Sequence, residues 1–217
     1  MASKAVELAS RELEPKPSLL SALEQLAYTL SYRGKPQEAL QAAEEAVQRN
    51  PNYADGYALL AHVLIYLGKP EEAISKANKA IALSTTQTNY PCHYDYHLGQ
   101  AYYVWGVLTE ATDREAAQRH YQQAETHLRD ALAKNDNFRP ARSYLVAVLS
   151  ELGRWAPERQ EGAKQEMTRS MAKGEPLARH LKSDNQALAE EHIRRITPYV
   201  NQEIRDRLRK AWLEAAR

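Results

Sequence analysis

The chain reads LSALEQLAYTLSYRGKPQEALQAAEEAVQRNPNY at residues 20–53 and ADGYALLAHVLIYLGKPEEAISKANKAIALSTTQ at residues 54–87. Aligned without a gap, the two segments place identical residues in register at a spacing of 34. The shared positions are Leu26 with Leu60, Ala27 with Ala61, Gly34 with Gly68, Pro36 with Pro70, Ala39 with Ala73 and Ala46 with Ala80. A period of this length, with small and apolar residues in register, is typical of a helical solenoid. A solenoid presents an extended surface instead of a buried catalytic pocket, so the pattern favours a binding function.

The pattern within each segment predicts a pair of helices. In the first segment a helix is expected from about residue 19 to residue 33, with apolar residues at helical spacing. Gly34 can adopt the left-handed dihedrals that end a helix, and Pro36 suits the first turn of the next helix. Asn50 and Pro51 end that second helix. Strand-like alternation is nowhere long enough to predict a sheet, so we expect an all-α chain.

Composition is that of an ordinary folded protein without a strong electrostatic bias. The 217 residues are 43% hydrophobic and 26% charged, and the formal net charge is +1. Such a balance provides no global field that would attract nucleic acid or an anionic membrane. The single cysteine, Cys92, fits a reducing compartment. The N-terminal sequence has no apolar core of the signal-peptide type, and we expect a cytoplasmic protein.

The residues in register resemble the tetratricopeptide repeat family, whose unit also has 34 residues. The matching positions are Leu23, Leu26, Ala27, Gly34, Ala39, Ala46 and Pro51 in the first unit, and Tyr57, Leu60, Ala61, Gly68, Ala73 and Ala80 in the second. The resemblance implies a right-handed superhelix of antiparallel helix pairs. It also implies a scaffold that binds other proteins and performs no catalysis.

A third unit begins near Cys92 and then departs from the repeat. Gly106 falls where the family has its helix-ending glycine, but Ala124, the next matching small residue, lies 18 residues later instead of 5. About 13 residues are therefore extra. Thr112 with Glu115 has the form of a capping box, which predicts a long helix from Asp113 to about residue 134. We expect an elongated hairpin that projects near residues 107–121.

Domain boundaries follow from these patterns. Residues 1–18 form an N-terminal segment or short helix, residues 19–174 an array of about four helix pairs, and residues 175–217 C-terminal capping helices. Helices are expected at about 185–197 and 200–216. The last has an apolar stripe at helical spacing that would cover the final repeat, made of Ile204, Leu208, Ala211 and Trp212. The basic residues between them are expected to face solvent, namely Arg205, Arg207, Arg209 and Lys210.

The resemblance implies that a concave groove binds the partner. Carrying the family's groove positions onto this chain selects Glu24, Tyr28, Tyr32, His62, Tyr66, His93, Tyr96, Gln100 and Tyr103. The tyrosines offer large contact areas with polar tips, which suits a peptide or a helix; alternatively, some of these rings pack between repeats. Members of the family that grip chaperone tails use a lysine, asparagine and arginine clamp. Glu24 would repel such a carboxylate, so this ligand is not expected.

A second chemistry is possible around His93 and His97, which lie four apart beside Cys92 and Asp95. With His62 on the neighbouring repeat, these side chains offer the ligands that zinc prefers. The alternative is a polar groove wall whose charge changes near pH 6–7. We expect no cofactor and no metal, because the spacing is a weak signal that any helix with two histidines can show.

Other functions were compared with groove binding. The sequence has no phosphate-binding loop, dinucleotide-binding glycine pattern, serine elbow or zinc-protease motif, so an enzyme is not expected. The runs 90–106, 135–154 and 197–216 resemble the C-terminal repeat region of some bacterial adenylate cyclases and related regulators, which implies a regulatory arm. A third alternative is self-association through the hairpin near residues 107–121 or through the C-terminal helices.

Overall fold

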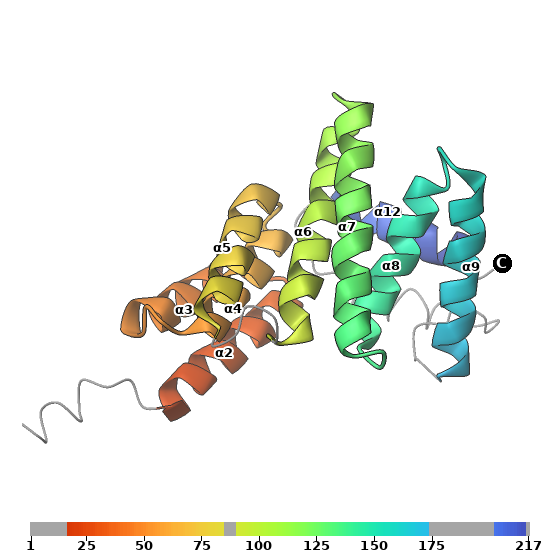
Figure 1. The fold of residues 1–217 in the computed structure, drawn as a ribbon. Coiled ribbons are helices and arrows are strands. Elements are labelled where there is room, and N and C mark those ends of the chain that lie inside the picture. The colour runs from red at the N-terminus through yellow and green to blue at the C-terminus, as the bar shows by residue number, and fades with distance from the viewer. Residues whose placement is uncertain (1–16, 85–89, 174–201, 216–217) are drawn as a thin grey trace, which may run out of the picture.

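A computed structural model describes residues 17–84, 90–173 and 202–215, and every regular element in these ranges is an α-helix (Figure 1). Four pairs of helices follow one another, confirming the predicted all-α solenoid. The pairs are α2 (Pro17–Tyr32) with α3 (Pro36–Arg49), α4 (Ala54–Tyr66) with α5 (Pro70–Leu83), α6 (Cys92–Thr109) with α7 (Arg114–Lys134), and α8 (Arg139–Leu152) with α9 (Pro157–Ala172). A final helix, α12, spans Gln202–Ala215.

The turn inside each of the first two pairs is built by the repeated glycine and proline. Gly34 and Gly68 have φ angles of 72° and 73°, a region in which side chains are strained. The amide that follows each glycine donates 2.9 Å to a carbonyl five residues back, which closes the preceding helix as a Schellman turn. Pro36 and Pro70 then start the next helix, where their missing N–H costs nothing.

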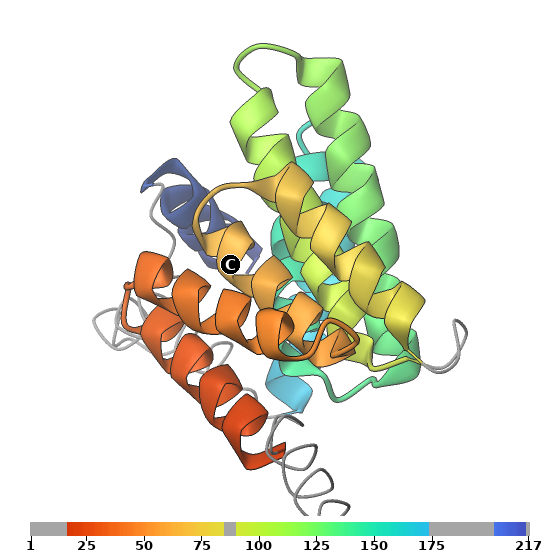
Figure 2. The same ribbon diagram turned by 90° about the vertical axis from the view of Figure 1, so that its left-hand side faces the viewer.

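Alanine lets the helices of these pairs approach closely. Six alanines on the second helices of the first two pairs have no exposed surface: Ala39, Ala43, Ala46, Ala73, Ala77 and Ala80. Helix α4 packs against the pair before it and the pair after it, and its residues from Ala58 to Tyr66 are all buried. Figure 2, viewed from the N-terminal side, shows successive pairs stacked one behind another and each turned relative to its neighbour.

The third pair contains the extra residues, which lengthen both of its helices. Helix α6 has 18 residues and α7 has 21, against 13 and 14 in the second pair. Gly106 does not end a helix, contrary to the expectation, because α6 continues to Thr109. Its role is close packing, since a Cβ at Gly106 would lie 2.5 Å from the Tyr121 ring of α7. The upper ends of the two helices extend beyond α5 and α8 in Figure 1.

The start of α7 differs by one residue from the expected capping box. Asp113, not Thr112, is the N-cap, and its carboxylate accepts a hydrogen bond of 2.8 Å from the Ala116 amide. Thr112 donates instead to the carbonyl of Thr109 at 3.0 Å. An aspartate at this position can satisfy the free amides of the first turn as well as a threonine can, and its charge also suits the helix dipole.

The last described helix lies across the fourth pair. Helix α12 packs against α8, α9 and α6, and in Figure 1 it crosses behind α8. It therefore contacts the first helices of two pairs, and not the end of the array alone. The expected helix at 185–197 and residues 1–16 of the N-terminal segment lie outside the described residues. Among the residues that are described, no helix is long and apolar enough to cross a membrane.

Candidate functional site

The residues expected in the groove lie on the first helices of the pairs. Helix α2 carries Glu24, Tyr28 and Tyr32, α4 carries His62 and Tyr66, and α6 carries His93, Tyr96, Gln100 and Tyr103. Residues four apart on a helix share one side, so each helix presents its members together. The helices α2, α4, α6 and α8 form what we call the inner face. Its N-terminal half is formed by α2, α4 and the start of α6, and its C-terminal half by the rest of α6 and α8.

Five rings in the N-terminal half contact one another and form what we call the aromatic wall: Tyr28, Tyr32, His62, Tyr66 and His97. His62 is at the centre, with its ring centroid 4.8 Å from that of Tyr28, 4.6 Å from that of Tyr66 and 5.3 Å from that of His97. Tyr32 lies 5.7 Å from His62. The contacts are edge-to-face, the arrangement that ring quadrupoles favour.

Burial divides the expected groove residues into two groups. Side chains of His62, Tyr66, Gln100 and Tyr103 are almost wholly buried, whereas Tyr32 is 51% exposed. Glu24, Tyr28, His93 and Tyr96 are partly exposed. Tyr66 and Tyr103 belong to the packed core, so the alternative that some rings pack between repeats is correct for these two. Truncating either one would remove core packing, and neither is suited to test partner binding.

The two buried histidines of the wall are neutral near physiological pH. Burial, with a smaller effect of nearby His93, lowers the pKa of His62 to about 3. Burial likewise holds the pKa of His97 well below its usual range. The expectation that this wall changes charge near pH 6–7 is therefore wrong for His62 and His97, because an imidazolium there would lose its hydration without gaining a carboxylate. Neither ring nitrogen of His62 has a hydrogen-bond partner.

Two carboxylates border the aromatic wall. Glu24 accepts a hydrogen bond of 2.9 Å from the Tyr53 hydroxyl, and Asp55 accepts one of 2.7 Å from the Tyr94 hydroxyl. Nε2 of His93 lies 3.5 Å from Oδ1 of Asp55. The contact with His93 lowers the pKa of Asp55; burial opposes this, and the Tyr94 hydrogen bond adds to the lowering. The edge of the wall therefore has negative charge.

The geometry does not assemble the zinc site that the histidines suggested. Of the described residues, one group of three brings its ligand atoms within 4.8 Å of one another, and it consists of Asp95, His127 and Asp130. Asp95 is already bound by Lys134 at 2.5 Å and by the Tyr90 hydroxyl at 2.8 Å. A lysine ammonium already provides the positive charge that a metal ion would bring to this carboxylate.

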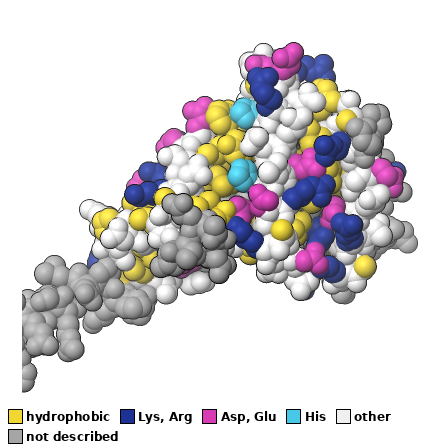
Figure 3. Space-filling view, viewed as in Figure 1, with side chains coloured by type: hydrophobic (Ala, Val, Ile, Leu, Met, Phe, Trp, Pro, Cys, Tyr) yellow, Lys and Arg dark blue, Asp and Glu magenta, His cyan; other side chains and the backbone are white. Residues whose placement is uncertain are grey.

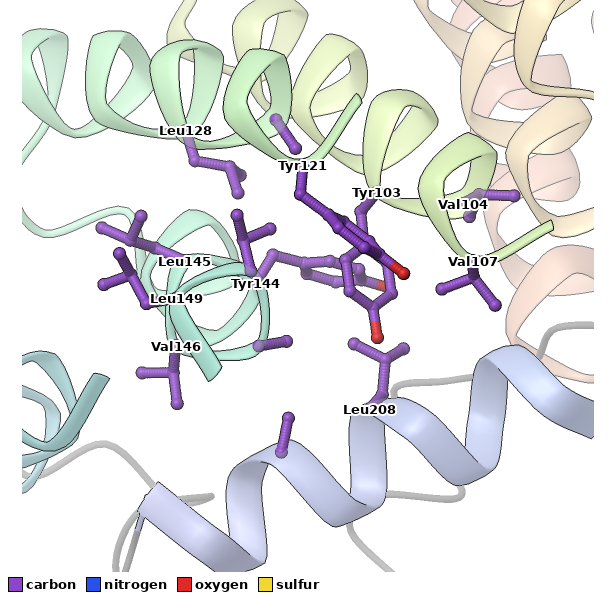
Figure 4. Packing of buried hydrophobic residues seen from close by; sticks show 14 of the residues in the cluster. Tyr103, Val104, Val107, Tyr121, Leu128, Tyr144, Leu145, Val146, Leu149 and Leu208 are labelled. Atoms are coloured by element: carbon purple, nitrogen blue, oxygen red, sulfur yellow. The ribbon is translucent and has the colours of Figure 1, made fainter. Parts of the chain in front are cut away.

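The C-terminal half of the inner face is covered by α12. Figure 4 shows Leu208 of α12 pointing at Tyr103, with Tyr121 and Tyr144 beside it. The indole of Trp212 is fully buried, and its Nε1 donates a hydrogen bond of 2.6 Å to the Ser143 carbonyl. All four residues of the predicted apolar stripe are buried. A helix of this chain therefore occupies the part of the groove where Tyr103 was expected to meet a partner.

Arginines neutralise the carboxylates of this half. Arg207 of α12 binds Glu110 and lies 3.4 Å from Glu151, while Arg154 binds the same two residues at 2.6 Å and 3.0 Å. Arg207 was expected to face solvent, but its side chain is 23% exposed. Burial would raise the pKa of Glu110, yet the two arginines lower it. For the more deeply buried Glu151, burial prevails over them and the pKa is raised.

A second aromatic cluster, on the outer face, was not anticipated from the sequence. Trp105 stacks on His120 at 4.1 Å, and Tyr102 stacks on His127 at 5.5 Å. Figure 3 shows histidines beside an apolar strip between α5 and α7. The available signal was the pair of histidines seven apart on α7, which places both on the side of the helix that meets α6.

Comparison with known proteins agrees with this architecture. Residues 31–83 match the tetratricopeptide repeat family. The fold is similar to the crystal structure of a thermophilic tetratricopeptide repeat protein in Thermus thermophilus, with a TM-score of 0.63 and 21% identity over 89% of this chain and 99% of that one. None of the curated proteins matches the sequence. Residues 31–83 therefore match the tetratricopeptide repeat family, and the described part of the chain has the fold of a tetratricopeptide repeat protein.

Proposed function

We propose that the protein is a non-catalytic scaffold that binds a helix or peptide of another protein on the N-terminal half of its inner face. The observation that carries this proposal is the asymmetry of that face. Its C-terminal half already holds an amphipathic helix, α12, which buries its apolar stripe there. The N-terminal half presents the partly exposed rings of Tyr28 and Tyr32 and the carboxylates beside them.

The contact chemistry of the N-terminal half suits recognition. Tyrosine combines a large apolar surface with a hydroxyl and loses few rotamers on binding, which is why it is enriched at interfaces. The buried rings behind Tyr28 and Tyr32 hold them in place through edge-to-face contacts with His62. A partner would meet a surface that is already ordered, which lowers the entropic cost of association.

Photo-cross-linking tests the location of the partner directly. The full chain would carry p-benzoylphenylalanine at Tyr32, with a matched chain carrying it at Gln41, an exposed residue of α3 on the outer side. We expect irradiation in cells that express the protein natively to attach a discrete partner at position 32 and not at position 41. The same products from both positions, or none from position 32, would contradict the proposal.

Two other functions remain as proposals with their own tests. A regulatory arm of a signalling protein such as an adenylate cyclase is supported by the resemblance of three sequence runs, and a catalytic segment in the same reading frame would support it further. Self-association through the ends of α6 and α7 predicts a mass that rises with concentration in light scattering. The cytoplasm is the proposed location, because the thiol of Cys92 is free.

A further inference from the structure

Carboxylates with little exposure are paired with arginine or lysine across most of this molecule. This holds wherever such a side chain lies beyond the second helix pair. The pairs are Asp95 with Lys134 at 2.5 Å, Glu110 with Arg154 at 2.6 Å, Glu125 with Arg159 at 2.6 Å and Glu166 with Arg142 at 2.7 Å. The pairing is expected, because a carboxylate that loses hydration needs a compensating charge.

Glu24 and Asp55, in the first two helix pairs, are more exposed than these carboxylates: the Asp55 side chain is 44% exposed and Glu24 is partly exposed. Within the described ranges, neither has a lysine or arginine partner, and the one ion-pair contact of Asp55 is with His93. Both carboxylates are instead held by tyrosine hydroxyls, which fix their orientation and leave their charge in place. Glu24 lies four residues before Tyr28 on the same side of α2. Burial is the larger cause of the raised pKa of the Tyr28 hydroxyl, and both carboxylates add to it.

The tyrosine rings beside these carboxylates could contact a cation bound there. Tyr28 is partly exposed and Tyr32 is 51% exposed, so both can offer a ring face or edge to a ligand. Behind them, His62 is 2% exposed, and both of its ring nitrogens lack a hydrogen-bond partner. Because His62 is neutral, it adds no positive charge that would repel a cation. A cation over a tyrosine ring gains electrostatic attraction in addition to its ion pair.

We propose that the N-terminal half of the inner face binds an arginine side chain projecting from the partner's helix, with Glu24 and Asp55 as its counter-charges and Tyr28 and Tyr32 as its ring contacts. This inference rests on the proposed function and specifies the partner as a basic amphipathic segment. Arginine fits better than lysine, because its planar guanidinium both stacks on rings and bridges carboxylates. The chain provides its own chemical precedent in Arg207, which a helix delivers to Glu110 and Glu151.

A double-mutant cycle with defined peptides tests this inference on the full chain. The first probe is a labelled peptide with the sequence of residues 202–215, and the second replaces its three arginines by citrulline, a neutral isostere. The protein variant is Glu24→Gln with Asp55→Asn. The matched control is Glu44→Gln with Glu71→Gln, which removes the same charge from exposed outer positions. Affinity is measured by fluorescence anisotropy, with circular dichroism to verify folding.

We expect the arginine peptide to bind the wild type and the control equally and the Glu24/Asp55 variant about tenfold more weakly, the scale of one close charge pair. The citrulline peptide should bind the wild type about tenfold more weakly and distinguish the proteins by less than about twofold. Equal binding of the two peptides to the wild type, or an unaffected Glu24/Asp55 variant, would overturn the inference, as would failure of both peptides to bind. If both peptides bind equally and Tyr32→Ala weakens both, the inner face is the docking site and the arginine inference alone is wrong.

Discussion

Both halves of the inner face contain aromatic rings and carboxylates, but α12 covers these side chains in the C-terminal half only. In the C-terminal half, aromatic rings and the carboxylates Glu110 and Glu151 are covered by α12, whose Arg207 pairs with both. In the N-terminal half, aromatic rings and the carboxylates Glu24 and Asp55 have no such arginine among the described residues. The same repeat architecture can therefore cover one half of its inner face with a helix of its own chain and leave similar carboxylates in the other half without an arginine among the described residues.

The largest difference in stability between the two halves is expected when the Trp212 side chain of α12 is removed. Trp212→Ala should lower the free energy of unfolding by about 3–5 kcal/mol, because it leaves a cavity and removes the indole hydrogen bond to the Ser143 carbonyl. Denaturant unfolding followed by circular dichroism measures the change. Tyr32→Ala, at the exposed edge of the other half, should cost less than about 1 kcal/mol. Similar costs for the two substitutions would show that α12 is not part of the stable core.

The next test concerns charge pairing in the C-terminal half. Arg207→Gln should cost about 2–3 kcal/mol near neutral pH, since two carboxylates with little exposure lose a charged partner. Because the pKa of Glu110 is lowered in the folded protein, the stability it contributes is present above the unfolded pKa and is lost as pH falls through the folded one.

The cost of Arg207→Gln should therefore shrink as pH falls through the lowered pKa of Glu110, because the carboxyl is then protonated in both proteins. Unfolding curves of wild type and variant at several pH values would show this convergence. A cost that is independent of pH would mean that Arg207 contributes by packing alone. Lys210→Gln, at a position 74% exposed on the same helix, provides a control variant with the same change of charge.

A third test uses the buried histidine of the N-terminal half. Its pKa is lowered in the folded state, so the unfolded chain binds the proton more tightly and stability falls as pH drops below about 6.5. Replacing His62 by Phe removes this group while keeping a ring in the wall. Between about pH 7 and pH 5, the variant should lose about 2 kcal/mol less stability than the wild type does. Equal losses would mean that His62 gains a proton without unfolding.

The smallest expected effect is on the stability of the N-terminal half when its charge is removed. Glu24→Gln keeps an oxygen that can accept the hydrogen bond from Tyr53, so its effect on unfolding should stay within about 0.5 kcal/mol. Thermal unfolding monitored by circular dichroism is sufficient for the measurement. A large loss of stability would show that Glu24 is a structural residue, and the contrast between the two halves would disappear.

Much of the fold follows from local chemistry in the sequence. Gly34 and Gly68 have the positive φ angles that their positions predict, because glycine alone adopts such angles without a steric cost. Pro36 and Pro70 start the next helices as predicted, because the proline ring fixes φ near the helical value. The third pair was harder to place. Gly106 has the sequence position of a helix-ending glycine, but a glycine is equally useful inside a helix where a neighbouring ring must come close.

The sequence identified most of the rings that contact one another in the N-terminal half, but it could not tell which of them are exposed. The family's groove positions selected Tyr28, Tyr32, His62 and Tyr66, and the rings of these residues contact one another in the structure. His97 joins the same aromatic wall, although the sequence suggested it only as a possible zinc ligand. Which of these rings remain accessible depends on the neighbouring helices, and periodicity contains no information on that. The buried state of Tyr66 and Tyr103 could therefore only come from the assembled structure.

Three features follow from local sequence, since each depends on residues close together in the chain: the helix pairs, the alanine contacts within them and the amphipathic character of α12. Other features follow only from the packing of the helices: α12 lies on the inner face, Arg207 is paired with Glu110, and Glu24 and Asp55 are without an arginine or lysine among the described residues. These outcomes join residues as much as 97 positions apart. They depend on which apolar surfaces and carboxylates are still exposed after the helix pairs have stacked. That exposure is set by the whole array, and no single segment determines it.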